Sequence, residues 1–224
     1  MTKEVYAVFV AGGSGSRMGG EVPKQFLQLG DVPILQRTVE NFLEAWPQSK
    51  VIIVLPERHI QMWRELCLEH AASFPQTIVK GGMTRFHSVR NALEKVPSGA
   101  IVAIHDGVRP FASKKLISGM IETMLQPSGP DCLIPAVPVT DTLRSTNPET
   151  PSPDRSCLVS VQTPQLFKSE VIKEAYKQAY STSFTDDASV AERAGYSVEI
   201  TEGERYNIKI TTPEDMHLAR LLLK

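Results

Sequence analysis

The stretch that decides the fold reads VYAVFVAGGSGSRMGG at residues 5–20. Residues 5–10 are apolar, β-branched or aromatic, a composition that favours a strand. Glycine then recurs through residues 12–20, and a glycine-rich turn lets backbone N–H groups converge on an anion. Arg17 and Lys24 add positive charge. The stretch therefore predicts a polyphosphate-binding loop at the carboxyl end of a first strand.

Two better-known phosphate-binding loops do not match this stretch. A P-loop requires Gly-x-x-x-x-Gly-Lys-Ser/Thr, whereas Lys24 here follows Pro23. The dinucleotide fingerprint Gly-x-Gly-x-x-Gly fails at its third glycine, which is replaced by Met18. That fingerprint also expects an acidic residue about 20 residues further on, at the end of a second strand, and none is present. A nicotinamide-dependent oxidoreductase is therefore disfavoured.

The bulk composition is that of a globular protein. The chain has 224 residues, 42% hydrophobic and 22% charged, which is enough for one domain with a sizeable core. Its net charge of −1 argues against binding to nucleic acid through bulk electrostatics. No signal peptide and no apolar run near 18 residues is evident, so we expect a cytoplasmic protein that does not bind membranes. The three cysteines lie far apart and form no metal-binding spacing.

Apolar strands alternate with helix-like segments along the chain. Strands are predicted at residues 51–55, 77–79, 101–104, 133–137, 158–161, 197–200 and 207–210. Helices are predicted at residues 33–45, 57–72, 85–96, 114–125, 169–180 and 186–194, and from residue 213 onward. Pro135 either weakens the strand around it or places that strand at a sheet edge. The alternation predicts an α/β fold, a Rossmann-like and mostly parallel twisted sheet with helices on both faces.

The composition changes at residues 139–160, which are rich in Thr, Ser, Pro and charge and lack helical periodicity. Long irregular segments within a domain are usually functional or form interfaces. We therefore expect a protruding β-arm here, with a mobile surface loop as the simpler alternative. Residues 1–224 are otherwise expected to form a single domain.

Polar residues follow several predicted strands, and the carboxyl ends of parallel strands share one edge of a sheet. These segments supply the cations Arg17, Lys24, Arg85, Arg109 and Lys209. In a chain of net charge −1, such a set predicts a polyanionic ligand. Asp106 stands among these cations. It either binds a ribose hydroxyl or a Mg²⁺ ion, directly or through water, or it orients Arg109.

The ordered motifs resemble one family of enzymes. The glycine stretch together with Pro23–Phe26 resembles the nucleotidyltransferases that activate sugar phosphates and polyol phosphates. Further motifs narrow the match: GGxxRxxS at 81–88, HDGVRP at 105–110, DT at 141–142, QTPQ at 162–165, TDDA at 185–188 and NIKIT at 207–211. With these, nearly the whole chain resembles the 2-C-methyl-D-erythritol 4-phosphate cytidylyltransferases of the non-mevalonate isoprenoid pathway.

The resemblance implies an activity and a role for each matching residue. The activity is transfer of CMP from CTP, bound with Mg²⁺, to methylerythritol phosphate, by in-line attack at the α-phosphorus with release of pyrophosphate. Arg17 and Lys24 are implied as catalytic residues on the triphosphate. The implied nucleotide-binding residues are Ala11, Gly12, Gly13, Gly15, Gly82, Arg85, Ser88, Asp106 and Gly107. The expected binding residues for the polyol phosphate are Arg109, Thr142, Arg155, Thr185 and Lys209.

In this family the arm crosses a homodimer, which implies that Thr142 and Arg155 serve the site of the neighbouring subunit. The chain departs from the family at Met83, where an acidic residue is frequent, and at Gly107, where alanine is usual. Backbone contacts to the nucleotide would survive both changes.

Two other functions remain open. A ribitol 5-phosphate cytidylyltransferase shares the glycine stretch, QTPQ and the Asn-Ile-Lys motif, although TDDAS at 185–189 favours the methylerythritol enzyme. A non-catalytic nucleotide-binding module is the alternative from a different class. The retained cations argue against it, because a simple nucleotide binder does not need cations for two separate phosphate groups.

Overall fold

The computed structural model describes residues 3–12, 22–147 and 149–223. Within these residues, an eight-stranded mixed sheet has the order β10-β7-β9-β6-β1-β4-β5, with β8 paired to β7. Its strands are β1 (Val5–Val10), β4 (Lys50–Leu55), β5 (Gln76–Lys80), β6 (Ile101–Asp106), β7 (Cys132–Pro138), β8 (Val159–Val161), β9 (Gln165–Lys168) and β10 (Glu199–Glu202). A separate small hairpin consists of β2 (Gln28–Leu29) and β3 (Val32–Pro33).

The helices lie between the strands in sequence. They are α1 (Ile34–Ala45), α2 (Glu57–Glu69), α3 (Arg85–Leu93), α4 (Lys114–Leu125), α5 (Ser169–Ala175), α6 (Asp187–Arg193) and α7 (Pro213–Leu222). Two short 3₁₀ helices, η2 (Lys24–Phe26) and η3 (Arg155–Cys157), interrupt the loops. Among the residues described, none of these helices is both long and apolar enough to cross a membrane.

The strand pairing confirms the predicted α/β class. β1 is parallel to its neighbours β4 and β6, and β5 is parallel to β4. β7 and β10 form another parallel pair, whereas β9 is antiparallel to both β6 and β7. The sheet is therefore mostly parallel, and the antiparallel strand β9 joins its two parallel parts.

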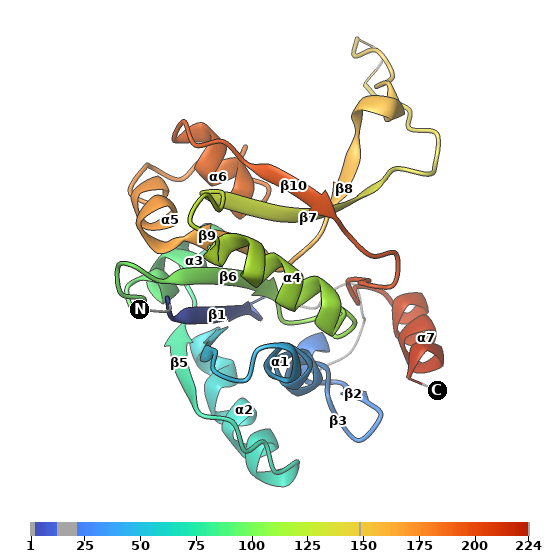
Figure 1. Ribbon diagram of the computed structural model, residues 1–224. Coiled ribbons are helices and arrows are strands. Elements are labelled where there is room, and N and C mark those ends of the chain that lie inside the picture. The colour runs from blue at the N-terminus through green and yellow to red at the C-terminus, as the bar shows by residue number, and fades with distance from the viewer. Residues whose placement is uncertain (1–2, 13–21, 148, 224) are drawn as a thin grey trace.

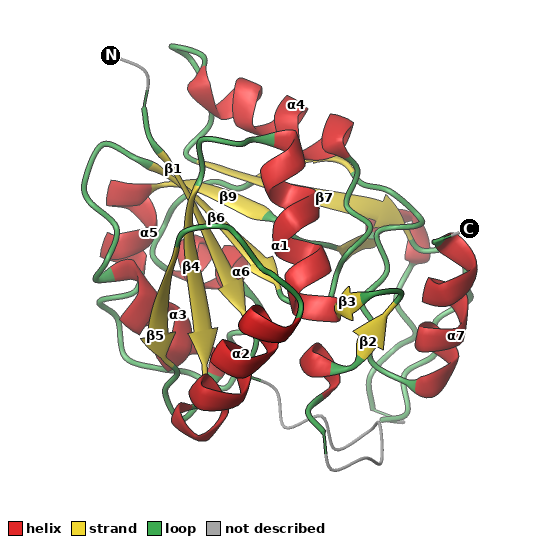
Figure 2. Ribbon diagram, turned by 90° about the horizontal axis from the view of Figure 1, so that it is seen from below, coloured by secondary structure: helices red, strands yellow, loops and turns green. Residues whose placement is uncertain are grey.

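Helices cover both faces of the sheet, with α1, α2 and α4 on one face and α3, α5 and α6 on the other (Figures 1 and 2). Phe9 of β1 packs in a cluster with Leu35 of α1 and Ile117 of α4. The neighbouring Val8 packs on the opposite face with Val89 of α3. Because successive strand residues point to opposite faces, a strand buried on both faces reads as a continuous apolar run.

A third apolar cluster lies beside the end of β6. It contains Leu29 of the β2–β3 hairpin, Val108 after β6, Ile210 in the segment before α7, and Met216 of α7. This cluster fixes the segment that carries Lys209 against the sheet.

Three sequence predictions about elements were wrong. Residues 207–210 form no strand; they run as an irregular segment whose Ile210 N–H donates to the Val108 carbonyl oxygen at 3.0 Å. Residues 176–180 do not continue α5. Pro135 lies inside β7, not at a sheet edge, because the neighbouring strand changes there from β9 to β8. Proline has no N–H to donate, and this gap in the hydrogen bonding lies at the point where the neighbouring strand changes. The Pro135 carbonyl oxygen accepts from the Gln162 N–H at 2.8 Å.

The segment between β7 and β8 protrudes from the sheet (Figure 1). At its base, β7 and β8 pair antiparallel, from Ala136 opposite Val161 to Pro138 opposite Val159. Beyond that base, the described residues from 141 to 157 are almost all exposed. This is the protruding arm that the change of composition predicted.

Candidate active site

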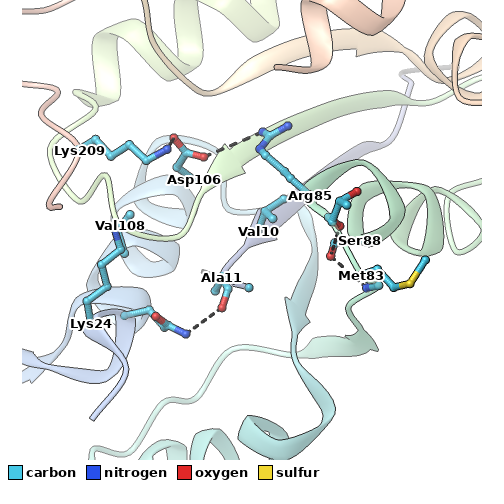
Figure 3. A pocket seen from close by; sticks show the side chains of 13 residues that line it. Val10, Ala11, Lys24, Met83, Arg85, Ser88, Asp106, Val108 and Lys209 are labelled. Carbon is cyan, nitrogen blue, oxygen red and sulfur yellow. Dashed lines mark hydrogen bonds and ion pairs between the residues drawn. The ribbon is translucent and has the colours of Figure 1, made fainter. Parts of the chain in front are cut away.

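A cavity of about 270 Å³ opens at the carboxyl ends of β1 and β6 (Figure 3). From β1 the chain first builds β4 and β5 on one side and later returns to place β6 on the other. Ligands of open α/β sheets bind at such a reversal of strand order. The cavity is lined by Val10, Ala11, Gly12, Lys24, Gln25, Gly82, Met83, Thr84, Arg85, Ser88, Asp106, Val108 and Lys209.

Most of the described residues predicted for the nucleotide and the triphosphate meet at this cavity. Those in its lining are Ala11, Gly12, Lys24, Gly82, Arg85, Ser88 and Asp106, together with Lys209 from the polyol-phosphate set. Gly107 and Arg109, the neighbours of the lining residues Asp106 and Val108, do not line it. Thr142, Arg155 and Thr185 are exposed and do not line it. Gly13, Gly15 and Arg17 lie outside the described residues.

Asp106 sits at the end of β6 among three cations. The residue has 7% of its surface exposed. Its Oδ2 lies 3.0 Å from Lys209 Nζ and accepts from Arg109 Nε at 3.2 Å, while Oδ1 lies 4.0 Å from Arg85 Nη2. Burial by itself raises the pKa of the Asp106 carboxyl, but the charges of Arg85, Lys209 and Arg109 outweigh it and hold that pKa well below its usual range. Asp106 is therefore ionised at neutral pH.

Arg85 begins α3 and lies between two carboxylates. Its Nη1 and Nη2 donate to Oδ1 and Oδ2 of Asp187 at 2.7 and 2.6 Å, a bidentate pair. The Tyr176 hydroxyl donates to the same carboxylate at 2.5 Å. Burial lowers the pKa of Arg85, but the Asp187 carboxylate outweighs burial and the pKa ends above its ordinary value. Arg85 is thus a fixed positive charge in the cavity wall.

Arg109 is held away from the cavity. Besides its bond to Asp106, its Nη1 donates to the Asn207 carbonyl oxygen at 2.7 Å. It therefore ties the loop after β6 to the segment that carries Lys209. Asp106 therefore orients Arg109, one of the roles that the sequence left open for Asp106, and Arg109, predicted to bind the polyol phosphate, does not line the cavity.

The base of the glycine stretch is anchored by the residues that follow it. Gln25 is buried and its Nε2 donates to the Ala11 carbonyl oxygen at 2.8 Å. The neighbouring Lys24 is 9% exposed, and its Nζ donates to the Ile210 carbonyl oxygen at 3.1 Å. The 3₁₀ helix η2 therefore places an ammonium group at the cavity and joins β1 to the Ile210 segment.

The first turn of α3 forms another wall of the cavity. The Ser88 hydroxyl accepts from the Gly82 N–H at 3.0 Å and donates to the Thr84 carbonyl oxygen at 2.9 Å. A Cβ on residue 82 would overlap the His87 side chain, so only glycine permits this close approach. Met83, by contrast, is 91% exposed at the cavity mouth.

The QTPQ motif supports several of these loops from behind. Thr163 Oγ1 accepts from the Asp106 N–H at 3.0 Å and lies 2.8 Å from Nδ1 of the buried His105. Gln162 Nε2 donates to the Glu204 carbonyl oxygen at 2.7 Å. Gln165 Nε2 donates to Asp186 at 2.8 Å, at the start of α6. The motif is a scaffold for the site, since its described members do not line the cavity.

The described residues contain no group of three or more His, Cys, Asp or Glu side chains arranged to hold a metal. Among the described residues, Asp106 is the carboxylate that lines the cavity. Because protein-bound Mg²⁺ typically uses one or two carboxylates and completes its shell with substrate phosphates and water, a single ionised carboxylate fits a cation that arrives with a nucleotide.

Sequence reasoning missed parts of the site. It assigned no role to Gln25 or Asp187, although both stand within the motifs quoted above. Each is a polar residue next to a predicted site residue, and this could have drawn attention to it. Nothing in the sequence, however, shows that Asp187 contacts Arg85, which is 102 residues away. Thr84 and Val108 line the cavity and carried no signal of their own.

Fold and site together define an α/β nucleotide-binding protein whose cavity carries charges suited to a polyanion. The family model for IspD, 2-C-methyl-D-erythritol 4-phosphate cytidylyltransferase, matches residues 5–224. The chain belongs to this family of nucleotidyltransferases.

Relatives with the same description extend over the whole chain. The 2-C-methyl-D-erythritol 4-phosphate cytidylyltransferase of Bacteroides fragilis is 45% identical over 219 residues, covering 97% of this chain and 98% of that protein. The crystal structure of 2-C-methyl-D-erythritol 4-phosphate cytidylyltransferase from Thermus thermophilus matches with a TM-score of 0.74 and 30% identity, covering 98% of both chains. The bifunctional IspDF from Campylobacter jejuni matches with a TM-score of 0.82 and 29% identity, covering 96% of this chain and 54% of that longer chain.

Proposed function

We propose that this chain transfers CMP from CTP to 2-C-methyl-D-erythritol 4-phosphate, giving 4-diphosphocytidyl-2-C-methyl-D-erythritol and pyrophosphate. Family membership over residues 5–224 supports this reaction. The single observation that carries it is the cavity at the strand-order reversal, where Lys24 lines the same cavity as the ionised Asp106, which itself lies between Arg85 and Lys209. Cations at several points of one cavity suit a reaction between two phosphorylated substrates.

The mechanism we propose is one in-line displacement. The phosphate of the polyol substrate is an anionic nucleophile and attacks the α-phosphorus of CTP, so that the bond to pyrophosphate breaks as the new P–O bond forms. No general base is needed. The barrier lies in bringing two polyanions together and in stabilising charge on the phosphoryl oxygens, which positioned cations achieve. Lys24, and Arg17 from the glycine stretch, take this catalytic role.

The remaining residues divide between the two substrates. We assign the nucleotide to Ala11, Gly12, Gly13, Gly15, Gly82, Arg85, Ser88, Asp106 and Gly107. We assign the polyol phosphate to Lys209 and Thr185, with Arg109 as the residue that orients the Lys209 segment. Lys209 lies on the far side of Asp106 from Arg85, which separates the two phosphate-binding regions (Figure 3).

Mg²⁺ is the divalent cation we propose to accompany CTP, and it neutralises part of the triphosphate charge when bound. Asp106 is the residue that holds it, directly or through water. The charges that depress the pKa of Asp106 keep this carboxylate ionised at neutral pH.

The second half of the site comes, in our proposal, from another subunit. The chain acts as one domain of residues 1–224 and dimerises through the arm at about 139–160, so that Thr142 and Arg155 reach the neighbouring cavity. Both residues are exposed in the segment between β7 and β8, which protrudes from the sheet, and this supports the assignment (Figure 1). We place the reaction in the cytoplasm, where both charged substrates are available.

The test is pyrophosphate release from CTP and Mg²⁺ with methylerythritol 4-phosphate and ribitol 5-phosphate offered in parallel. Turnover with methylerythritol 4-phosphate alone is the expected result. Turnover with ribitol 5-phosphate alone would keep the mechanism and move the protein to another polyol. Release with neither substrate would contradict the proposed catalysis.

A further inference from the structure

Two neighbouring acids stand at the start of α6, and the structure gives them different partners. Asp186 is the N-cap: its Oδ1 accepts from the Ser189 N–H at 2.9 Å and its Oδ2 accepts from Gln165 Nε2 at 2.8 Å. These contacts account fully for an aspartate at a helix N-terminus. Asp186 therefore needs no further role.

Asp187 points instead into the protein toward the cavity wall. Its side chain is 0% exposed. Its two carboxylate oxygens accept two hydrogen bonds from the Arg85 guanidinium and one from the Tyr176 hydroxyl. A buried carboxylate is costly unless it is paired and hydrogen-bonded. The pairing here uses a residue that lines the cavity, so the buried charge acts on the site.

Arg85 is held between two unequal anions. Its Nη2 lies 2.6 Å from Asp187 Oδ2 and 4.0 Å from Asp106 Oδ1. Asp106 is also bonded to Lys209 and Arg109. If the charge of Asp187 were lost, Asp106 would be the nearest anion left, and the guanidinium would be drawn along the cavity wall toward it.

We propose that Asp187 is a positioning residue that acts through Arg85, holding its guanidinium at the nucleotide side of the cavity and away from Asp106. This inference rests on the proposed function, because it takes the ligand at Arg85 to be CTP. It adds a buried residue outside the cavity lining to those that determine how CTP binds.

A double-mutant cycle tests this coupling. Asp187→Asn should raise KM for CTP on the order of tenfold, the effect of losing one charged hydrogen bond to a ligand. The kcat should change less than about threefold, since Lys24 is left in place. In an Arg85→Gln background, Asp187→Asn should add less than about twofold to KM, because the group it positions is already absent.

Two control variants separate positioning from simple stability. Asp186→Asn makes the same chemical change one residue away and should leave KM within about twofold, even where it lowers the unfolding midpoint. Tyr176→Phe removes another hydrogen bond from the same carboxylate and keeps the bidentate pair, so it should also spare KM.

Three results would overturn the inference: an unchanged or lower KM in Asp187→Asn, a full additional rise in the Arg85→Gln background, or an equal rise in Asp186→Asn. If Asp187→Asn does not fold, Arg85→Lys replaces it, because lysine keeps the charge but cannot form two parallel bonds. A raised KM then supports the inference, and a normal KM overturns it. Failure of the proposed function would be recognised separately, because the wild-type protein would then show no CTP turnover.

Discussion

The cavity and the arm hold their polar side chains in opposite ways. In the cavity, Asp106 is buried and lies within 4.0 Å of cations from three different segments. In the arm, Arg155 is exposed, and its Nη1 donates to the carbonyl oxygen of Thr140 in the same arm at 2.7 Å. Buried charges require fixed partners, whereas exposed charges do not. The cavity is therefore organised by side chains of one chain, and the described part of the arm has no such ion pairs with the sheet.

The largest effect should follow from removing Lys24 from the cavity. Lys24→Ala should lower kcat by about 10²–10³, or 2.7–4 kcal/mol, as expected for loss of a preorganised donor to the transition state. Steady-state pyrophosphate release measures it. Lys95→Ala, at an exposed lysine, is the control and should keep the wild-type kcat. A near-normal kcat in Lys24→Ala would contradict the catalytic role.

The next prediction compares how much a lost carboxylate destabilises the protein in the cavity and in the arm. Asp106→Asn should lower the free energy of unfolding by about 3 kcal/mol, because it leaves Arg109 and Lys209 without their shared anion. This loss of free energy is at the low end for a broken buried ion pair, since Lys209 is partly exposed to solvent. Urea unfolding measures it. Asp154→Asn makes the same change in the arm and should leave the midpoint unchanged; equal losses in both variants would remove the distinction.

A third prediction concerns the arm alone. Arg155→Ala should raise KM for the polyol phosphate about tenfold, because a charged contact to the phosphate is lost. The urea midpoint should not move, since Arg155 is exposed. Arg144→Ala in the same arm is the control and should leave KM unchanged. If Arg155→Ala spares KM, Arg155 does not bind this substrate.

The smallest effect is a pH dependence of stability from His105, next to Asp106. Burial lowers the pKa of His105 to about 3, despite the opposing influence of Asp106. Below about pH 6.5 the unfolded chain therefore binds a proton that the folded chain does not, and stability falls on acidification by on the order of 1 kcal/mol per pH unit. Urea unfolding between about pH 7.5 and 5 measures the slope. His105→Asn should reduce it, and an unchanged slope would refute this origin.

The sequence predicted best the elements that are buried on both faces. Residues 51–55 and 101–104 are continuous apolar runs, and both lie in parallel strands of the sheet. The strand at 165–168 was missed, because only Leu166 and Phe167 are apolar and Gln165 is buried for its hydrogen bonds. Residues 207–210 were predicted as a strand, but Ile208 and Ile210 pack in the third apolar cluster, and the segment does not pair with a strand of the sheet.

Several residues that line the cavity were predictable from the motifs, whereas the contacts that join distant segments there were not. Lys24 and Asp106 were found because they follow strands whose carboxyl ends share an edge. The environment of Arg85 was not foreseen, since its partner Asp187 comes from the start of α6. Which of two adjacent acids turns inward depends on packing that no local pattern records.

The most direct test of the proposed dimer is whether the cavity of one subunit uses the arm of another. Lys24→Ala and Arg155→Glu should each be nearly inactive at subsaturating polyol phosphate. Mixed in equal amounts with subunit exchange, they form heterodimers in which one of the two sites carries neither change. We expect recovery of about a quarter of the wild-type rate, since about half of the dimers are mixed and one of the two sites in each is intact. No recovery, despite heterodimers in the mixture, would contradict this use of the arm.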